Sequence, residues 1–121
     1  MTKRILVVED QDDNRQILRD LLAHAGYEVF EVDNGEQALP AATEHRPDVI
    51  LMDIQLPLLD GYEATRRIKA DPSLKHIPII VVTSYALSGD EARARIAGCD
   101  AYVAKPFSPR ALLEKIRQFA S

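Results

Sequence analysis

Short apolar runs recur along the chain at regular intervals. They occupy residues 5–8, 29–32, 49–52, 79–82 and 101–104. Most of them are rich in β-branched residues and nearly continuous rather than alternating with polar residues. This pattern is typical of strands that are buried on both faces of a parallel sheet. The hydrophobic pattern therefore predicts five parallel strands.

The stretches between these runs have the apolar spacing of helices. In the first stretch, Leu18, Leu21 and Leu22 lie on one helical face with Ala25, and Gly26 follows as a C-terminal stop signal. In the last stretch, the first turn contains proline, which is favoured there. An apolar stripe follows it, made of Leu112, Leu113, Ile116 and Phe119.

Strands and helices alternate along the whole chain, which predicts an α/β fold with five βα units. Turn signals at residues 34–35, 60–61 and 88–90 precede the other three helices. Connections between parallel strands are right-handed, so helices should cover both faces of one sheet. Pro40 lies inside the predicted second helix and should either kink it or delay its start.

Length and composition place the chain among globular single-domain proteins. It has 121 residues, of which 46% are hydrophobic and 28% charged, with a net charge of −4. A mildly acidic chain is a poor ligand for nucleic acid or an anionic membrane. The single cysteine, Cys99, cannot form an internal disulfide bond. No apolar run approaches the roughly 20 residues of a membrane span, so we expect a cytoplasmic protein.

Polar residues follow four of the predicted strands. Glu9 and Asp10 end the first, Asp53 the third, Thr83 and Ser84 the fourth, and Lys105 the fifth. Ligands of open parallel sheets bind beyond the carboxyl ends of the strands, so these side chains should meet at one edge. Crowded carboxylates repel one another unless a cation lies among them. Oxygen ligands without His or Cys favour Mg²⁺.

The same edge has groups suited to an anion. Lys105 supplies a positive charge and Thr83 a hydroxyl, which together would hold the oxygens of a phosphoryl group. A carboxylate beside Mg²⁺ can also act as a nucleophile and become an aspartyl phosphate. Of the three acids, Asp53 occupies the centre of this set.

These motifs, in this order, resemble those of the response-regulator receiver domain of two-component signalling, a flavodoxin-like phosphoacceptor. The resemblance covers the whole chain, 1–121. Its motifs are the acid pair in VVED, the central acid in LMDIQLP, the hydroxyl in VVTSYA and the lysine in AKPF. MDIQLP, GDE and GCDAY are also similar to those of stand-alone DivK-like regulators, and receivers of hybrid histidine kinases share these features.

The resemblance implies a role for each site residue. Asp53 would be the phosphoacceptor, and Thr83 and Lys105 would contact the phosphoryl oxygens. Mg²⁺ would be held by Asp10, Asp53, the carbonyl of Gln55 and, through water, Glu9.

The resemblance also implies a switch, a bond geometry and a control of phosphate lifetime. Thr83 and Tyr102 would form the switch, although composition alone favours a core role for Tyr102. The Lys105–Pro106 bond would be cis. Gln55 and Tyr85 would flank the path of the water that attacks the phosphate.

The resemblance further implies the partners of the protein and its response to phosphorylation. A histidine kinase or a histidine phosphotransfer protein would be the phosphodonor. Phosphorylation would change the surface of the fourth helix, fifth strand and fifth helix, which a downstream protein would sense. The protein would be a monomer or a weak phosphorylation-dependent dimer. It would not be an enzyme beyond promoting its own phosphotransfer and slow dephosphorylation. The chain ends at Ser121, so we expect no output domain.

Three other functions fit the pattern less well. A Mg²⁺-dependent hydrolase with an aspartate nucleophile usually has a general acid two residues later, where this chain has Gln55. A flavin- or nucleotide-binding module would need a glycine-rich phosphate loop, and no strand is followed by one. A binding-only pseudo-receiver is disfavoured by the intact set of Asp53, Thr83 and Lys105.

Three residues of the first predicted helix, Asp12, Asp13 and Ile17, have a structural and a functional interpretation. Asp12 and Asp13 lie where this helix begins, which favours a helix cap and a contact with the helix dipole over metal binding. Ile17 lies just off the apolar stripe. It is either an exposed docking residue or a buried flank position, and the sequence does not separate the two.

Overall fold

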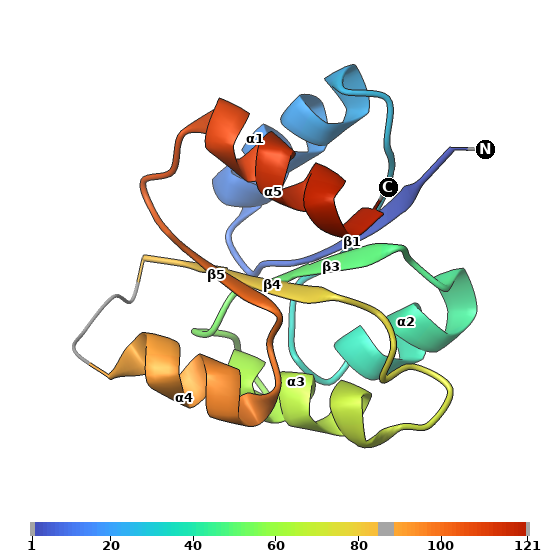
Figure 1. The fold of residues 1–121 in the computed structure, drawn as a ribbon, viewed down its shortest axis with the longest axis vertical. Helices are drawn as coiled ribbons and strands as arrows, with labels where there is room; N and C mark the ends of the chain where they lie inside the picture. Colours follow the sequence, from blue (N-terminus) through green and yellow to red (C-terminus); the bar gives the residue numbers. More distant parts are fainter. Residues whose placement is uncertain (1, 85–88, 121) are drawn as a thin grey trace.

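The computed structural model describes residues 2–84 and 89–120, and within them five strands alternate with five helices (Figure 1). In chain order these elements are β1 (Arg4–Val8), α1 (Asp12–His24), β2 (Glu28–Val32), α2 (Ala38–His45), β3 (Val49–Met52), α3 (Gly61–Ala70), β4 (Ile79–Thr83), α4 (Asp90–Ala97), β5 (Ala101–Ala104) and α5 (Pro109–Ala120).

The strands form one parallel sheet in the order β2-β1-β3-β4-β5. β1 lies between two partners, so that Leu6 is opposite Phe30 on β2 and Ile50 on β3. The chain first steps from β1 to β2 and then crosses back to β3 on the other side of β1. This is the flavodoxin-like topology, and it confirms the predicted fold class.

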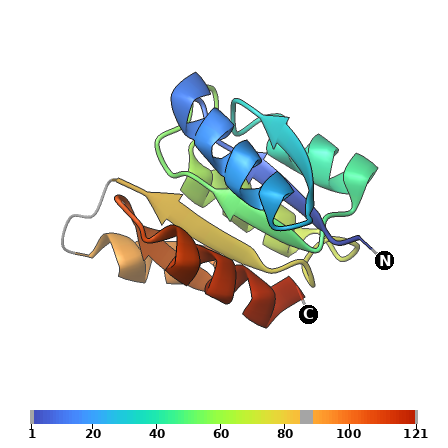
Figure 2. The same cartoon turned by 90° about the horizontal axis from the view of Figure 1, so that it is seen from above.

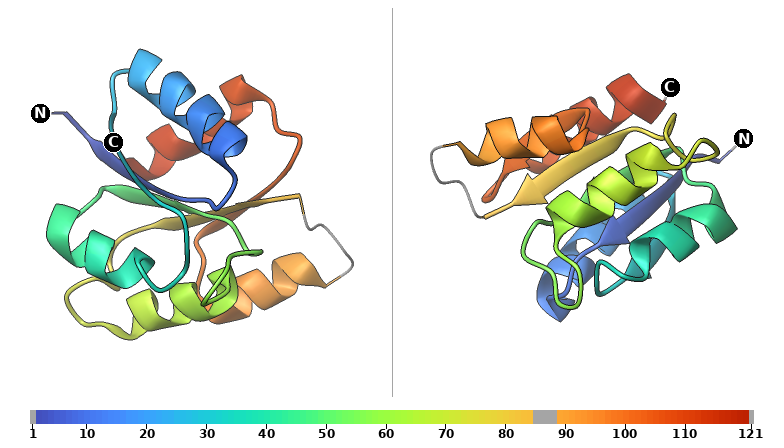
Figure 3. Two further views of the ribbon diagram at one scale, coloured as in Figure 1. Left: turned by 180° about the vertical axis from the view of Figure 1, so that it is seen from behind. Right: turned by 90° about the horizontal axis from the view of Figure 1, so that it is seen from below.

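Helices cover both faces of the sheet. α1 and α5 lie over one face (Figure 2), and α2, α3 and α4 lie side by side over the other (Figure 3). Successive strand residues point to opposite faces. Ile5, Val7 and Leu51 therefore pack with α1 and α5, whereas Leu6 and Ile50 pack with the other three helices. Each strand contributes to two cores, which explains its nearly continuous apolar sequence.

The C-terminal end of α1 and the N-terminal end of α5 match the sequence signals. Gly26 follows α1 with a φ of +95°, a conformation in which glycine is favoured. Its backbone N–H donates to the Ala23 carbonyl at 3.0 Å. α5 begins at Pro109, and the Ser108 hydroxyl accepts a hydrogen bond from the Ala111 N–H at 3.3 Å. Both ends are therefore fixed by local residues.

The starts of α2 and α1 bear on two local expectations from the sequence. α2 begins at Ala38 rather than at Glu36, which places Pro40 in the first turn, where a missing N–H breaks no helical hydrogen bond. The expected cap at Asp12 or Asp13 is wrong, because the N-cap residue is Gln11 and it makes no side-chain capping bond. Both aspartates lie in the first turn of α1, where their charge still favours the helix dipole.

Lys69 joins the end of α3 to the start of β4 and β5. Its ammonium donates to the Ile77 carbonyl at 2.8 Å, to the Lys75 carbonyl at 3.2 Å and to Asp100 at 2.8 Å. The same Asp100 oxygen accepts from the Ile79 N–H at 2.8 Å. The Lys69 side chain is only 18% exposed, so water replaces it poorly.

We expect Lys69→Met to lower the free energy of unfolding by about 2 kcal/mol, because it leaves two carbonyls and a carboxylate without their charged donor. Urea unfolding followed by circular dichroism measures this. Lys75→Met, at an exposed neighbouring position, is the control and should change stability by less than about 0.5 kcal/mol. Equal small effects in both variants would show that Lys69 does not hold these elements together.

Within the described part of the chain, no helix is long and apolar enough to cross a membrane.

Candidate functional site

Three acidic residues lie at the point where the strand order reverses. β1 and β3 are neighbours whose chain connections run to opposite sides, and ligands of open α/β sheets bind at such a point. Glu9 and Asp10 follow β1, and Asp53 follows β3. One carboxylate oxygen from each lies within 4.8 Å of the others. Glu9 and Asp53 are 2% and 8% exposed, whereas Asp10 is exposed.

Lys105 reaches the two buried acids from the end of β5. Its ammonium lies 2.5 Å from Glu9 Oε1 and 3.2 Å from Asp53 Oδ2, and its side chain is 14% exposed. The peptide bond between Lys105 and Pro106 is cis, which agrees with the sequence-based expectation. The other oxygen of Asp53, Oδ1, accepts a hydrogen bond from the Ile54 N–H at 2.6 Å. The Asp53 carboxylate is thus held on both sides.

The charges of this cluster do not balance. The pKa of Glu9 is raised to about 7, mainly because the carboxyl group is buried. The hydrogen bond from Lys105 lowers this pKa, whereas the negative charge of Asp53 raises it. Burial alone would lower the pKa of Lys105, but Glu9 and Asp53 outweigh it and raise that pKa above its usual value. One ammonium faces three carboxyl groups. An additional cation would offset the remaining repulsion.

The donor set fits a hard divalent cation. Among the described residues, the ligand atoms gathered here are all carboxylate oxygens, and one of the three acids faces solvent, from which a hydrated ion would enter. Mg²⁺ binds oxygen ligands and keeps several of its waters, so a partly open cluster suits it better than a closed cage. Glu9, Asp10 and Asp53 could therefore hold this ion.

A cavity of about 140 Å³ opens beside the acids, and its lining includes residues that the sequence did not reveal. Gln55 lines it, as expected for a residue near a bound ion, and Ser84 follows Thr83 at the end of β4. Asn14 and Gln11 also line it, although the sequence analysis assigned them no role. Asn14 lies in the first turn of α1, directly after the loop that carries Asp10, and this closeness in the chain is the signal that could have found it.

Among the described residues, the lining of the acid cavity includes neither of the two expected switch residues, although the Thr83 carbonyl accepts a hydrogen bond from the Lys105 N–H at 2.8 Å. Thr83 is 1% exposed at the end of β4. Tyr102, on β5 opposite Val81, is half-buried against the core under α2, α3 and α4, and burial raises the pKa of its hydroxyl. Tyr85 lies outside the described residues.

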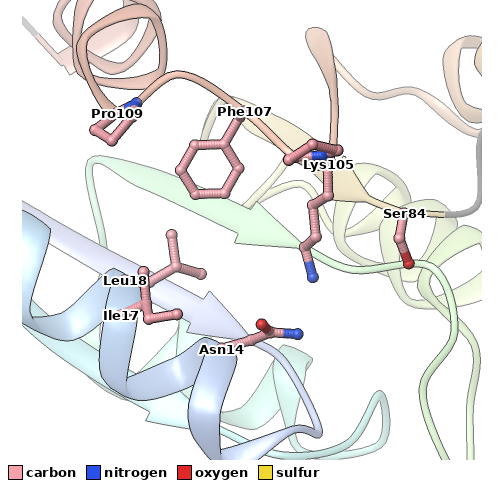
Figure 4. Close-up of a pocket in the computed structure, with 8 residues that line it drawn as sticks. Asn14, Ile17, Leu18, Ser84, Lys105, Phe107 and Pro109 are labelled. Atoms are coloured by element: carbon pink, nitrogen blue, oxygen red, sulfur yellow. The ribbon is translucent and has the colours of Figure 1, made fainter.

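A larger groove adjoins the acid cavity (Figure 4). It measures about 480 Å³, and Asn14, Ser84 and Lys105 line both hollows. Figure 4 shows Lys105 and Ser84 at one end of the groove and Pro109 at the other, with Phe107 between them and facing Leu18 of α1. The apolar lining comes from Ile17, Leu18, Pro106, Phe107 and Pro109.

Ile17 is 58% exposed, which decides between the two alternatives left by the sequence in favour of exposure.

Fold and cluster together define a class, a flavodoxin-like domain with an acidic, lysine-containing site at its switch point. A family model, the response regulator receiver domain, matches residues 5–117. The chain belongs to this family of two-component signalling proteins, so it takes part in phosphorylation-dependent signalling. It is 48% identical to the polar-differentiation response regulator DivK of Brucella anthropi, over 98% of this chain and 97% of that protein.

Solved structures agree with this membership. The receiver domain of a Pseudomonas aeruginosa sensor histidine kinase, which has a magnesium ion coordinated in its active-site cleft, is 40% identical with a TM-score of 0.92. That match covers 99% of this chain and 98% of the other. The phosphorylated cyanobacterial phytochrome response regulator RcpA is 30% identical with a TM-score of 0.83, over 98% and 91% of the two chains.

Proposed function

We propose that this protein is a switch that accepts a phosphoryl group on Asp53 from a phosphohistidine of a kinase or phosphotransfer protein. The observation that carries the proposal is the position of Asp53. Its carboxylate is buried, oriented by the Ile54 N–H and by Lys105, and lies on a cavity that is open to solvent. A carboxylate held in this way is a positioned nucleophile.

In the proposed step, one oxygen of Asp53 attacks phosphorus in line with the bond to the donor imidazole. The phosphorus–nitrogen bond breaks, an acyl phosphate forms, and the imidazole takes its proton from solvent. The transferring group is metaphosphate-like, so the protein contributes mainly position and charge. The Lys105 ammonium, which pairs with Glu9 and Asp53 before the step, would stay within reach of the new phosphoryl oxygens.

For Mg²⁺ we propose Asp10, Asp53 and the carbonyl of Gln55 as ligands, with Glu9 bound through water. The ion would neutralise the phosphoryl oxygens and the crowded acids while the new bond forms. The oxygen cluster supports this assignment, and the P. aeruginosa receiver with its magnesium ion is a 40% identical precedent.

For the response we propose that Thr83 moves toward the phosphoryl group and that Tyr102 turns inward. Thr83 is buried at the end of β4, and Tyr102 already packs at the edge of the core beside α4. The surface of α4, β5 and α5 would change, and a downstream protein would bind one of its two forms. Gln55 would orient the water that later removes the phosphate, with Tyr85 as the opposing shield.

Mass spectrometry of the protein after incubation with Mg²⁺ and acetyl phosphate tests the proposal. We expect the gain of one phosphoryl group, located on Asp53 by peptide mapping, and no gain when EDTA replaces Mg²⁺. No gain at all, or a phosphoryl group on another residue, would contradict it. A hydrolase would instead turn over the donor without a lasting mass gain.

The apolar groove is the proposed contact for the phosphodonor protein, because it shares three lining residues with the acid cavity. A partner that presents phosphohistidine to Asp53 must lie across it. We expect Ile17→Asp to slow phosphotransfer from a phosphotransfer protein by about tenfold or more, since it places a charge at an apolar contact. Phosphorylation by acetyl phosphate, which needs no docking, should stay within about twofold of wild type.

Ile96→Asp is the matched control. Ile96 is 83% exposed on α4, on the other side of the sheet from the groove. Its replacement by aspartate makes the same change of charge and polarity as Ile17→Asp. It should leave both phosphodonors at wild-type rates. Equal slowing in the two variants, or slowing with acetyl phosphate as well, would show that the groove is not the docking site.

A further inference from the structure

Arg15 connects the loop after β1 with α1 and β2. Its guanidinium donates from Nη1 to the carbonyl oxygen of Glu9 at 2.9 Å. Its Nε lies 3.5 Å from Glu31 on β2, and its Nη2 pairs with Asp12. The Arg15 side chain is only 16% exposed. Because Asp12 is 89% exposed, its ion pair with Arg15 contributes little to stability. The contacts with the Glu9 carbonyl and with Glu31 therefore hold the Arg15 side chain in place.

Glu31 is itself fixed by a second arginine. Arg19, one helical turn after Arg15, donates to the two oxygens of Glu31 at 2.5 and 2.9 Å. A guanidinium that bonds both oxygens of a carboxylate restricts its orientation. Glu31 is therefore held in place by Arg19 and presents a defined partner to Arg15. The chain of contacts runs from β2 to the Glu9 carbonyl.

The Glu9 carbonyl belongs to the peptide that joins the two acids of the site. A peptide unit is planar, so fixing its oxygen also fixes the direction in which the chain enters Asp10. On either side, the Glu9 N–H donates to the Val32 carbonyl at 3.1 Å and the Gln11 N–H donates to Glu9 Oε2 at 3.3 Å. Arg15 supplies the side-chain contact to this peptide.

We propose that Arg15 is a positioning residue for the divalent cation site, acting through the Glu9 carbonyl on the orientation of Glu9 and Asp10. This inference rests on the proposed function only in assuming that Mg²⁺ binds at Glu9, Asp10 and Asp53. Residues that orient ligands from outside the coordination sphere commonly change metal affinity by about 10- to 100-fold.

A purely electrostatic role makes the opposite prediction. The positive guanidinium lies near the acids, so its charge alone repels Mg²⁺, and removing the charge would tighten binding. Lysine keeps the charge but lacks the planar fork that reaches two acceptors at once. Arg15→Lys and Arg15→Met therefore separate geometry from charge.

Mg²⁺ binding measured by isothermal titration calorimetry tests the proposal. We expect Arg15→Lys and Arg15→Met both to weaken Mg²⁺ binding by about tenfold. Arg19→Lys is the matched control, because it changes the same residue type on the same helix and contacts the same glutamate. It should bind Mg²⁺ within about twofold of wild type, because lysine still supplies a positive partner that keeps Glu31 beside Arg15, and the described hydrogen bonds of the Arg19 side chain go to Glu31 rather than to Glu9.

A second variant and an experiment at saturating Mg²⁺ distinguish the proposed role of Arg15 from a general loss of structure. Glu31→Gln removes the charged anchor of Arg15 without altering the loop, and it should weaken Mg²⁺ binding in the same direction. Raising Mg²⁺ to saturation should restore the acetyl phosphate reaction of Arg15→Lys to the wild-type rate.

Unchanged Mg²⁺ affinity in Arg15→Lys, or tighter binding in Arg15→Met, would overturn the proposal. So would a melting temperature that falls in EDTA while Mg²⁺ affinity stays constant, because that result indicates a structural role alone. Failure of the proposed function looks different. In that case Asp10→Asn would bind Mg²⁺ as well as the wild-type protein does.

Discussion

Asp53→Asn is expected to take up no phosphoryl group from acetyl phosphate or from a phosphorylated partner. An amide of nearly the same shape replaces the carboxylate, and it lacks the charged oxygen that attacks phosphorus. We expect the rate to fall by more than about a hundredfold, to the background of other carboxylates. Intact-protein mass spectrometry over time measures the loss.

The same variant should keep its fold. The Asn oxygen can still accept from the Ile54 N–H, and the loss of one charge relieves the repulsion between Asp53 and Glu9. The contact to Lys105 weakens at the same time, so the two effects oppose each other. We expect the free energy of unfolding without Mg²⁺ to change by no more than about 1 kcal/mol.

Asp13→Asn is the control for the change of charge. Asp13 is exposed in the first turn of α1 and lies close to the site in the chain. It should be phosphorylated at the wild-type rate. Normal phosphorylation of Asp53→Asn, or a loss shared by both variants, would mean that Asp53 is not the phosphoacceptor.

The strands could be predicted closely because burial on both faces requires a nearly continuous apolar sequence. Each strand packs against two cores, so nearly every position is apolar, and turn residues mark the ends. The start of α2 does not follow from the pattern alone, because Pro40 disfavours a helix only beyond the first turn. The N-cap of α1 is not predictable from residue type, because Asp12 and Asp13 are favoured cap residues whereas Gln11, which occupies the position, is not.

The acids of the site could be predicted because strand ends in a parallel sheet meet at one edge. This rule places Glu9, Asp10, Asp53 and Lys105 together without knowledge of any side-chain conformation. It says nothing about Asn14 or Arg15, which reach the site from the surface of α1. Whether a helical side chain turns toward a sheet edge depends on how the helix is rotated, and short sequence patterns do not determine that angle.

Glycine at position 61 is expected to be essential to the same site. Gly61 begins α3, and its N–H donates to the Ile54 carbonyl at 2.8 Å. A Cβ at this position would lie 2.0 Å from the backbone oxygen of Asp53 and 2.8 Å from the Ile54 Cα. Both obstacles are backbone atoms, so no side-chain rotation can relieve the overlap.

We expect Gly61→Ala to lower the free energy of unfolding by about 3 kcal/mol, although alanine is the better helix former, because the overlap forces the backbone apart. The displaced segment carries Asp53, so the folded protein should also be phosphorylated about tenfold more slowly, in keeping with the sensitivity of reactive groups to small misplacements. Urea unfolding gives the first quantity, and acetyl phosphate kinetics corrected for the folded fraction give the second.

Gly26→Ala separates the two effects. Gly26 has a φ of +95°, so alanine is strained there, but a Cβ would meet no atom within 4 Å. This variant should lose about 1 kcal/mol of stability and keep the wild-type phosphorylation rate of its folded fraction. If Gly61→Ala also reacts at that rate once folded, the loop after β3 adapts without moving Asp53. If it reacts more slowly, the close packing of α3 against the Asp53 backbone sets the position of the nucleophile.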